Sequence, residues 1–537
     1  MTKEEGQSPV VMLNLGLMEI RLVSASDQVF SAFSRHTFHP RPCLPAGRHR
    51  TGFSGAISNK HHEKLLYSNF KKQKIIFLYR SGCIFFCEML KFLTDLYGCA
   101  APGEKGDIEM THYVNYGNGK QDFSLPKGWN LISDQDKPSI PGVSDPLQEI
   151  KHALDHPIGA PKIEELARPG MEVALLFDDL QRPTPVHLAL PEILNRLNRA
   201  GIPDGRITGI CALGTHPIPS MEQLKKKVGE EAFSRLQEHL FAHDPHASDN
   251  VIIGKTHRGT LVEINRHVAF ADLIIGVGEC MPHPCAGFGG GCKIIMPGVC
   301  SYRSVADHHF TWMRHRNSKV NFLDGNSFYE EIVDAGRIAR LSFKLDFIIN
   351  EKKDVIRAFA GDPVAEHREA SHYAASLYLI PLPKMADVTI ASAFPLEVGV
   401  QATKALVMAG FCTRSGGTII WVAPQKEAGP IMPLIKEMGS SESAGDFHRR
   451  LILGEIPEHL RSFGISYIMQ VVFFKELPEK FNVVHVTEGL SPEQVRMMKF
   501  SYSPNIQEAI NQVSKKMPKA DVAVFPSGGN IIPEVRY

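Results

Sequence analysis

Residues 276–309 constrain the fold of this chain more than any other segment. An apolar run at 272–278 leads into them, and its continuous hydrophobicity predicts a strand buried on both faces of a parallel sheet. A glycine-rich turn at 287–291 follows, and Lys293 stands almost directly after it. Strand, glycine turn and reactive side chain in this order are typical of α/β proteins that bind a ligand at the carboxyl edge of the sheet.

The glycine turn matches neither of two well-known phosphate-binding motifs. A P-loop requires Gly-Lys-Ser/Thr, whereas Cys292 precedes Lys293 here and Ile294 follows it. The dinucleotide fingerprint G-x-G-x-x-G is matched only loosely. The turn therefore indicates a ligand without identifying it.

Strand and helix patterns alternate along the chain after residue 110, which predicts an α/β fold with mostly parallel sheets. Strands are expected at 173–177, 207–213, 272–278, 388–391, 418–423, 465–474, 483–486 and 522–525, and helices at 185–200, 220–240 and 400–409. Thr184 is expected to be the N-cap of the helix that begins at Pro185. A Pro-rich stretch near residue 380 divides the pattern. We therefore expect an N-terminal α/β domain at 110–380, a C-terminal α/β domain at 381–537, and an active site in the cleft between them.

Residues 1–109 lack both the helical and the strand period. The segment 35–55 is dense in His, Arg, Pro and Cys. We expect a poorly structured extension, which is either disordered or the product of a start site placed too far upstream, with Met110 as the natural first residue.

Charge and hydropathy exclude several classes of partner. A formal net charge of +1 gives no electrostatic reason to expect nucleic acid. The longest apolar stretch, 75–96, is broken by Arg80, Glu88, Lys91 and Asp95, so no membrane span is expected. The ten cysteines follow no secreted disulfide pattern, which favours a reducing, cytoplasmic location.

Polar side chains stand where the predicted strands end or shortly after. The candidates are Asp179, Arg182, His216, His283, Lys293 and His309 in the first predicted domain and Gln401 and Lys404 in the second. Each has an ordinary alternative: a turn ion pair, a structural histidine or a solvated helix face. Together they would provide two histidines for proton transfer, two cations for a carboxylate, and a third histidine for a metal. This set indicates chemistry at a carbon next to a carboxylate.

Four cysteines lie close to these candidates. Cys280, Cys285, Cys292 and Cys300 match none of the short C-x₂-C metal patterns. We therefore expect buried thiols at these positions.

Six separated motifs resemble those of the nickel-dependent lactate racemase family. They are Asp179-x-x-Arg182-Pro-Thr-Pro, Gly214-Thr215-His216, Pro282-His283 with Ala286-Gly287-Phe288-x-Gly290-Gly291-x-Lys293, Pro297-Gly298, His309, and Gln401-x-x-Lys404. The resemblance covers about residues 110–537. The sequence departs from the family pattern at Gln181, Pro217, Cys292 and Val400, beside the matching residues.

The resemblance implies a nickel pincer nucleotide, which is a nicotinic-acid-derived mononucleotide carrying two sulfurs, as thioamide and thiocarboxylate. It implies that Lys293 can tether the nucleotide covalently and that His309, rather than its neighbour His308, binds nickel. His216 and His283 match the acid/base pair. The remaining matches assign Arg182, Lys404 and Gln401 to substrate binding and Asp179 to cofactor binding.

The activity implied by the resemblance is racemisation or epimerisation of a 2-hydroxy acid, lactate or a relative. Hydride would leave the α-carbon for the cofactor and return to the other face. The expected partners are the small substrate and the enzymes that build the cofactor, with no nucleic acid and no membrane. Two alternatives remain open: a metal-dependent hydrolase or lyase that uses the His-rich cleft, and a non-catalytic α/β protein that binds a small molecule.

Overall fold

The computed structural model describes residues 11–15, 18–22, 56–58, 63–70, 73–80 and 111–536, except 136–139, 398, 427 and 428. The chain forms two compact units, Met1–Ile108 and Glu109–Tyr537.

In the first unit, five strands are described: β1 (Val11–Leu15), β2 (Met18–Leu22), β3 (Ala56–Ser58), β4 (Glu63–Phe70) and β5 (Gln73–Arg80). β1 pairs with β2, and β3, β4 and β5 form a second sheet, with all pairs antiparallel. Most of the expected extension, including 35–55, lies outside the described residues. Its disorder or upstream start therefore stays a prediction.

The first large sheet of the second unit has six strands in the order β11-β10-β9-β14-β17-β18. Their bounds are β9 (Val173–Asp178), β10 (Ile207–Ala212), β11 (Leu240–Ala242), β14 (Leu273–Glu279), β17 (Phe343–Ile349) and β18 (Val355–Gly361). All neighbours are parallel except β17 and β18. The predicted mostly parallel sheet is thus confirmed, and every residue of β9 and β14 is buried.

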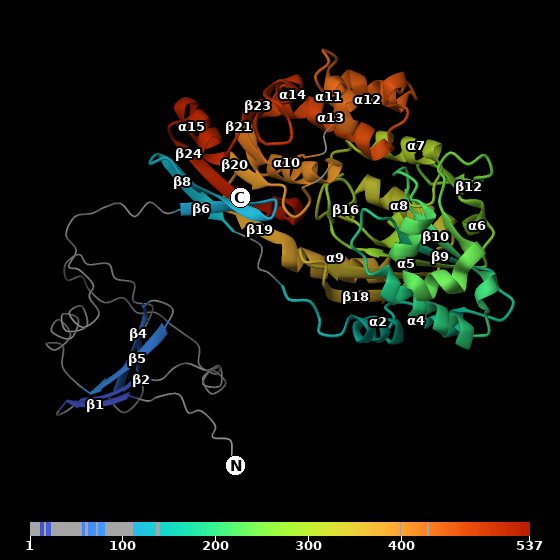
Figure 1. The fold of residues 1–537 in the computed structure, drawn as a ribbon, viewed down its shortest axis with the longest axis horizontal. Coiled ribbons are helices and arrows are strands. Elements are labelled where there is room, and N and C mark those ends of the chain that lie inside the picture. The colour runs from blue at the N-terminus through green and yellow to red at the C-terminus, as the bar shows by residue number, and fades with distance from the viewer. Residues whose placement is uncertain are drawn as a thin grey trace. The chain divides into compact units, whose positions relative to one another are not determined.

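Helices cover both faces of this sheet. They are α2 (Pro146–Asp155), α3 (Ile163–Leu166), α4 (Val186–Arg199), α5 (Met221–Leu236), α6 (Arg266–Ala269), α7 (Tyr302–Trp312), α8 (Ser327–Ile338) and α9 (Ala365–Tyr378). Because side chains alternate along a strand, Leu175 and Phe177 of β9 join one core with α2 to α5, while Ala174 and Leu176 join another with α7 to α9. Figure 1 accordingly shows α2 and α4 on one side of β18 and α9 on the other.

The second large sheet is parallel throughout, in the order β23-β22-β21-β20-β24-β8. Its strands are β8 (Trp129–Asp134), β20 (Ala386–Ser392), β21 (Thr413–Val422), β22 (Asn482–Val486), β23 (Ser501–Ser503) and β24 (Ala520–Phe525). Its helices are α10 (Thr403–Gly410), α11 (Met432–Met438), α12 (Ala444–Ile452), α13 (Ile465–Lys480), α14 (Pro492–Met497) and α15 (Ile506–Lys516). β8 lies beside β24 although it precedes the first large sheet in the chain (Figure 1). The domain boundary near residue 380 stays a prediction.

Four two-stranded pairs complete the unit. They are β6 (Thr111–Tyr116) with β7 (Gly119–Ser124), β12 (Val251–Lys255) with β13 (Leu261–Ile264), β15 (Pro282–His283) with β16 (Gly287–Phe288), and β19 (Leu379–Leu382) with β25 (Ile532–Val535). Short 3₁₀ turns lie between elements; two of them, η4 (Gly291–Ile294) and η5 (Gly399–Ala402), carry candidate site residues.

Two expectations about secondary structure were wrong. The segment 465–474 is the start of helix α13 and not a strand. Its apolar residues are buried on most sides of the helix, so neither the strand nor the helix period stands out. Thr184 is not the N-cap of α4: its hydroxyl donates instead to the buried carboxylate of Asp178, and Pro185 occupies the cap position.

No helix among the described residues is long and apolar enough to cross a membrane.

Candidate active site

A pocket at the carboxyl ends of β9, β10 and β14 brings together five of the eight predicted site residues. Its walls include Asp179, Arg182, His216, Lys293 and His309. Ser466 of α13 also lines it, and the neighbouring Ile465 N–H donates to the hydroxyl of Thr215 at 2.9 Å. Helix α13 is therefore fixed against the loop that carries His216. The expected inter-domain cleft stays a prediction.

His216 is held in one tautomer by Asp179. Its Nδ1 lies 2.7 Å from Oδ2 of Asp179, which is buried. Burial alone would raise the pKa of Asp179, but hydrogen bonding to His216 and the nearby Arg182 and Lys227 hold it below its usual value. An ionised carboxylate accepts only, so Nδ1 of His216 carries the proton. Nε2 of neutral His216 is then a proton acceptor.

His283 is held in the opposite tautomer. Its Nδ1 accepts hydrogen bonds from the backbone N–H groups of Cys285 at 3.2 Å and Ala286 at 3.0 Å. Burial, followed by the charge of Lys293, lowers the pKa of His283 well below its usual value. The neutral ring with Nδ1 as acceptor carries its proton on Nε2. His283 can therefore donate a hydrogen bond from Nε2.

Lys293 follows a glycine turn that two buried side chains hold by hydrogen bonds to its backbone. Asp346 of β17 accepts from Gly291 N–H at 2.5 Å, and His367 of α9 donates from Nε2 to the carbonyl of Gly289 at 2.9 Å. Gly291 has φ +52°, and a Cβ there would lie 2.7 Å from Cγ of His367. Only glycine fits so close to the His367 ring. The hydrogen bonds that Asp346 and His367 form with the turn fix the start of η4 and with it the position of Lys293.

The amine of Lys293 is easier to deprotonate than an ordinary lysine. Burial, followed by the positive charge of Arg182, lowers the pKa of Lys293 to about 8. A neutral amine is a nucleophile. Lys293 is therefore suited to the covalent attachment of a ligand near neutral pH.

This pKa predicts how Lys293 should react in cofactor-free protein. The rate at which an amine reagent labels Lys293 should rise as pH rises through about 8 and then level off. With the lowered pKa, the reactive neutral amine is already the main form above that pH. Peptide mass spectrometry at a series of pH values would measure it, with the exposed Lys226 as the control for reagent reactivity. A rise that continues to the usual lysine range near pH ~10.4 would contradict the shift.

Arg182 and Lys404 converge on one sulfur atom. The guanidinium of Arg182 lies 3.2 Å from Sδ of Met281, and Nζ of Lys404 lies 3.7 Å from the same atom. A thioether is only a weak acceptor. In the described part of the chain, neither cation forms an ion pair. Burial, followed by Arg182, lowers the pKa of Lys404 well below its usual value, and Glu279 opposes this. An anion bound between the two side chains would favour the charged form of Lys404, so the pair can form a site for an anion.

Gln401 in η5 reaches the same loop from the C-terminal half. Its Nε2 donates to Oε1 of Gln181 at 3.3 Å. Its own Oε1 is buried and has no hydrogen-bond partner among the described residues. An unpaired buried oxygen is a position that a ligand donor can satisfy.

His309 and His308 of α7 have different surroundings. His309 lines the pocket, and its Nδ1 lies 3.0 Å from Nδ1 of His308. Nε2 of His308 lies 3.0 Å from the carbonyl oxygen of Phe328. Burial lowers the pKa of His308 to about 3 and that of His309 well below its usual value. Both nitrogens of His308 are thus engaged, whereas Nε2 of His309 has no partner among the described residues.

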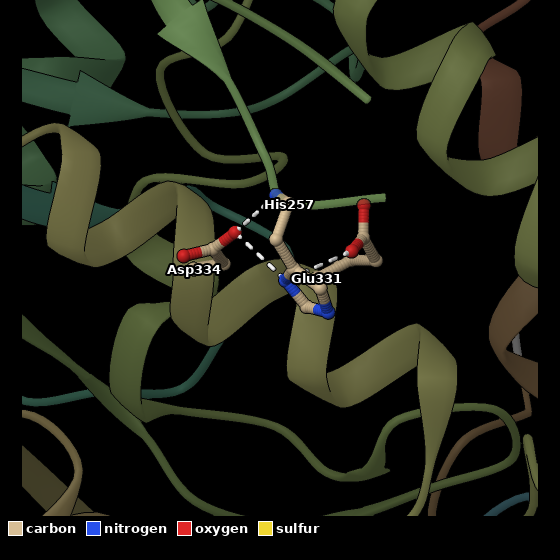
Figure 2. Close-up of side chains that lie close together, drawn as sticks. All are labelled: His257, Glu331 and Asp334. Carbon is tan, nitrogen blue, oxygen red and sulfur yellow. Dashed lines mark hydrogen bonds and ion pairs between the residues drawn. The ribbon is translucent and has the colours of Figure 1, made fainter. Parts of the chain in front are cut away.

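A separate cluster away from this pocket has the spacing of a metal site. It comprises His257, Glu331 and Asp334 (Figure 2). Nδ1 of His257 lies 3.0 Å from Asp334, and Arg258 lies 3.6 Å from the Glu331 oxygen that accepts no hydrogen bond. The histidine is already paired and an arginine faces the free oxygen. The cluster therefore serves to fix the 256–260 turn to α8.

The residues that support the pocket were not predicted from the sequence: Glu279, His308, Asp346, His367 and Met281. One signal was available, because Lys344 and Asp346 are charged residues within an otherwise apolar strand, where they form a buried ion pair. The expected buried thiols are confirmed, since Cys280, Cys285, Cys292 and Cys300 are all buried and free.

Comparison with known proteins extends the match along most of the chain. Residues 116–321 match the lactate racemase N-terminal domain. A lactate racemase from Lactiplantibacillus plantarum is 29% identical over 392 residues, covering 72% of this chain and 90% of that protein. A lactate racemase from Thermoanaerobacterium thermosaccharolyticum is 26% identical over 427 residues, covering 78% and 98%.

Two solved structures share the fold. The lactate racemase apoprotein from Thermoanaerobacterium thermosaccharolyticum superposes with a TM-score of 0.69 at 23% identity, covering 80% of this chain and 100% of that one. A protein from Thermotoga maritima gives 0.53 at 18% identity, covering 73% and 98%. At these identities the likeness shows the fold alone. Taken with the sequence matches, it shows that the chain is similar to the lactate racemases over most of its length.

Proposed function

We propose that the protein is a racemase or epimerase of a 2-hydroxy acid, lactate or a relative, which works by hydride transfer to and from a nickel pincer nucleotide. The relatives named lactate racemase are isomerases, and they support racemase activity on lactate. We further propose a cytoplasmic location, to which the six free, buried cysteines of the described residues are suited.

The convergence of Arg182 and Lys404 on Met281 carries the proposal. Arg182 and the buried Lys404 share only a weak sulfur acceptor, which favours a carboxylate between them. The arginine offers a planar fork and the lysine a point charge, so together they can fix the orientation of a small carboxylate. A 2-hydroxy acid bound there would present its hydroxyl group to the histidines.

His216 and His283 would handle the proton of that hydroxyl. Nε2 of His216 accepts it, and Asp179 stabilises the imidazolium that results. Nε2–H of His283 donates a hydrogen bond to the same oxygen as it becomes the carbonyl of the 2-keto acid. The reverse steps return the proton. That the two histidines share the acid/base work stays a prediction.

The residues around the pocket fit the nickel pincer nucleotide. Lys293 would hold it through its amine, the Nε2 lone pair of His309 would ligate the nickel, and the unpaired Oε1 of Gln401 could accept a donor. Asp179, which contacts His216 in the structure, stays a predicted cofactor contact. When bound, the cofactor supplies the acceptor and donor for the hydrogen of the substrate α-carbon.

The donor set argues against the hydrolase or lyase alternative. A catalytic zinc takes three protein ligands from His, Cys or carboxylates. Among the described residues, no such group of three surrounds His309. One histidine suffices where a cofactor provides the other ligands.

Lactate deuterated at the α-carbon would test the function in ordinary water. Protein co-expressed with the cofactor-building enzymes should invert it, and the inverted product should keep most of its deuterium, because the hydrogen returns from the cofactor. Chiral chromatography would measure inversion and mass spectrometry the label. His216→Ala protein prepared in parallel is the control for contaminating activity. Rapid washout of the label would defeat hydride transfer, and wild-type protein without inversion would defeat the proposed activity on lactate.

A further inference from the structure

The pair His308–His309 forms a hydrogen-bond chain that ends at the pocket. It begins at the carbonyl oxygen of Phe328, which lies 3.0 Å from Nε2 of His308. It continues from Nδ1 of His308 to Nδ1 of His309, again at 3.0 Å. Of the two residues, only His309 lines the pocket with Lys293.

The order of donors along this chain is determined by its first member. A carbonyl oxygen only accepts, so Nε2 of His308 carries the proton. An imidazole that carries its proton on Nε2 holds a lone pair on Nδ1, so Nδ1 of the buried His308 is the acceptor. The single proton between the two Nδ1 atoms therefore belongs to His309. This leaves Nε2 of His309 as a lone pair, the form in which imidazole binds a metal.

We propose that His308 is the positioning residue of the metal ligand: by accepting the Nδ1 proton of His309, it fixes the tautomer and ring orientation that direct Nε2 of His309 at nickel. The inference rests on the proposed function. Metal-ligating histidines commonly donate their other N–H to a partner that orients them and makes them more basic. Here the partner is a second histidine, aligned in turn by a backbone carbonyl.

Packing holds this arrangement in place. The ring of Phe328 lies edge-on to both histidines, with centroid distances of 4.4 Å to His308 and 5.0 Å to His309. Loss of His308 should consequently weaken nickel binding in part rather than abolish it.

A matched pair of variants tests the inference. His308→Leu removes the acceptor. His308→Asn introduces a side chain of nearly the same shape as leucine but keeps an acceptor oxygen at the position of Nδ1. Each protein is co-expressed with the cofactor-building enzymes, and its apparent nickel dissociation constant is measured by competition with a chelator. We expect His308→Leu to bind nickel about 10–100-fold more weakly and His308→Asn to stay close to wild type. Intact mass should show the adduct on Lys293 in all three proteins, which verifies that the pocket has folded.

Each other outcome has a definite meaning. Equal nickel affinity in His308→Leu and wild type overturns the inference. An equal loss of affinity in His308→Leu and His308→Asn also overturns it, because the loss would then come from altered packing rather than from the missing acceptor. If His308→Leu fails to fold, His308→Asn decides, because it must retain nickel. Wild-type protein that carries neither adduct nor nickel would overturn the proposed function itself and this inference with it.

Discussion

Replacing Asp179 with asparagine should slow the interconversion of the lactate enantiomers by on the order of 10⁴-fold. The carboxylate accepts from Nδ1 of His216 and so leaves Nε2 as the base. An asparagine amide can donate to Nδ1 instead, which moves the ring proton to Nε2 and removes the base. Initial rates of racemisation in both directions would measure the loss.

A variant that combines Asp179→Asn with His216→Ala tests whether the carboxylate acts through the histidine. His216→Ala should cost about 10²–10⁴-fold, and adding Asp179→Asn should cost little more, because the carboxylate acts through the histidine. Asp122→Asn, at an exposed position of β7, is the matched control and should keep full activity. Additive losses in the double variant would show that Asp179 has a separate role, such as cofactor binding.

Replacing Lys293 with methionine should remove all covalently bound cofactor mass from the protein. The amine is the nucleophile, and methionine has a chain of similar length with no nitrogen. Intact-mass measurement after co-expression with the cofactor-building enzymes would detect the loss, even where loosely held cofactor remains. The exposed Lys319→Met variant is the control and should retain the adduct. An unchanged adduct in Lys293→Met would exclude this attachment site.

Strand ends explain why much of the site could be predicted from the sequence. Asp179, His216 and Lys293 follow strands whose continuous hydrophobicity is evident, and parallel strands present their carboxyl ends at one edge. The helix α13 could not be predicted in the same way, because an all-round buried helix and a buried strand have similar composition.

Which ring nitrogen of each histidine carries the proton also could not be predicted from the sequence. His216 and His283 look equivalent as residue types, yet one faces a carboxylate and the other two backbone N–H groups. The same holds for His308 and His309, which are neighbours in sequence but differ in which side of α7 meets the pocket. Tautomers depend on partners that only the folded chain brings together.

The pairing of β8 with β24 has a consequence for the order in which the protein is made. Trp129 of β8 leaves the ribosome long before its partner Ala520 is synthesised. All six strands of the first large sheet are therefore translated before the partner strand of β8 is available. The pairing of β8 with β24 can form only after β24 has been synthesised, so this long-range step follows the translation of the first large sheet.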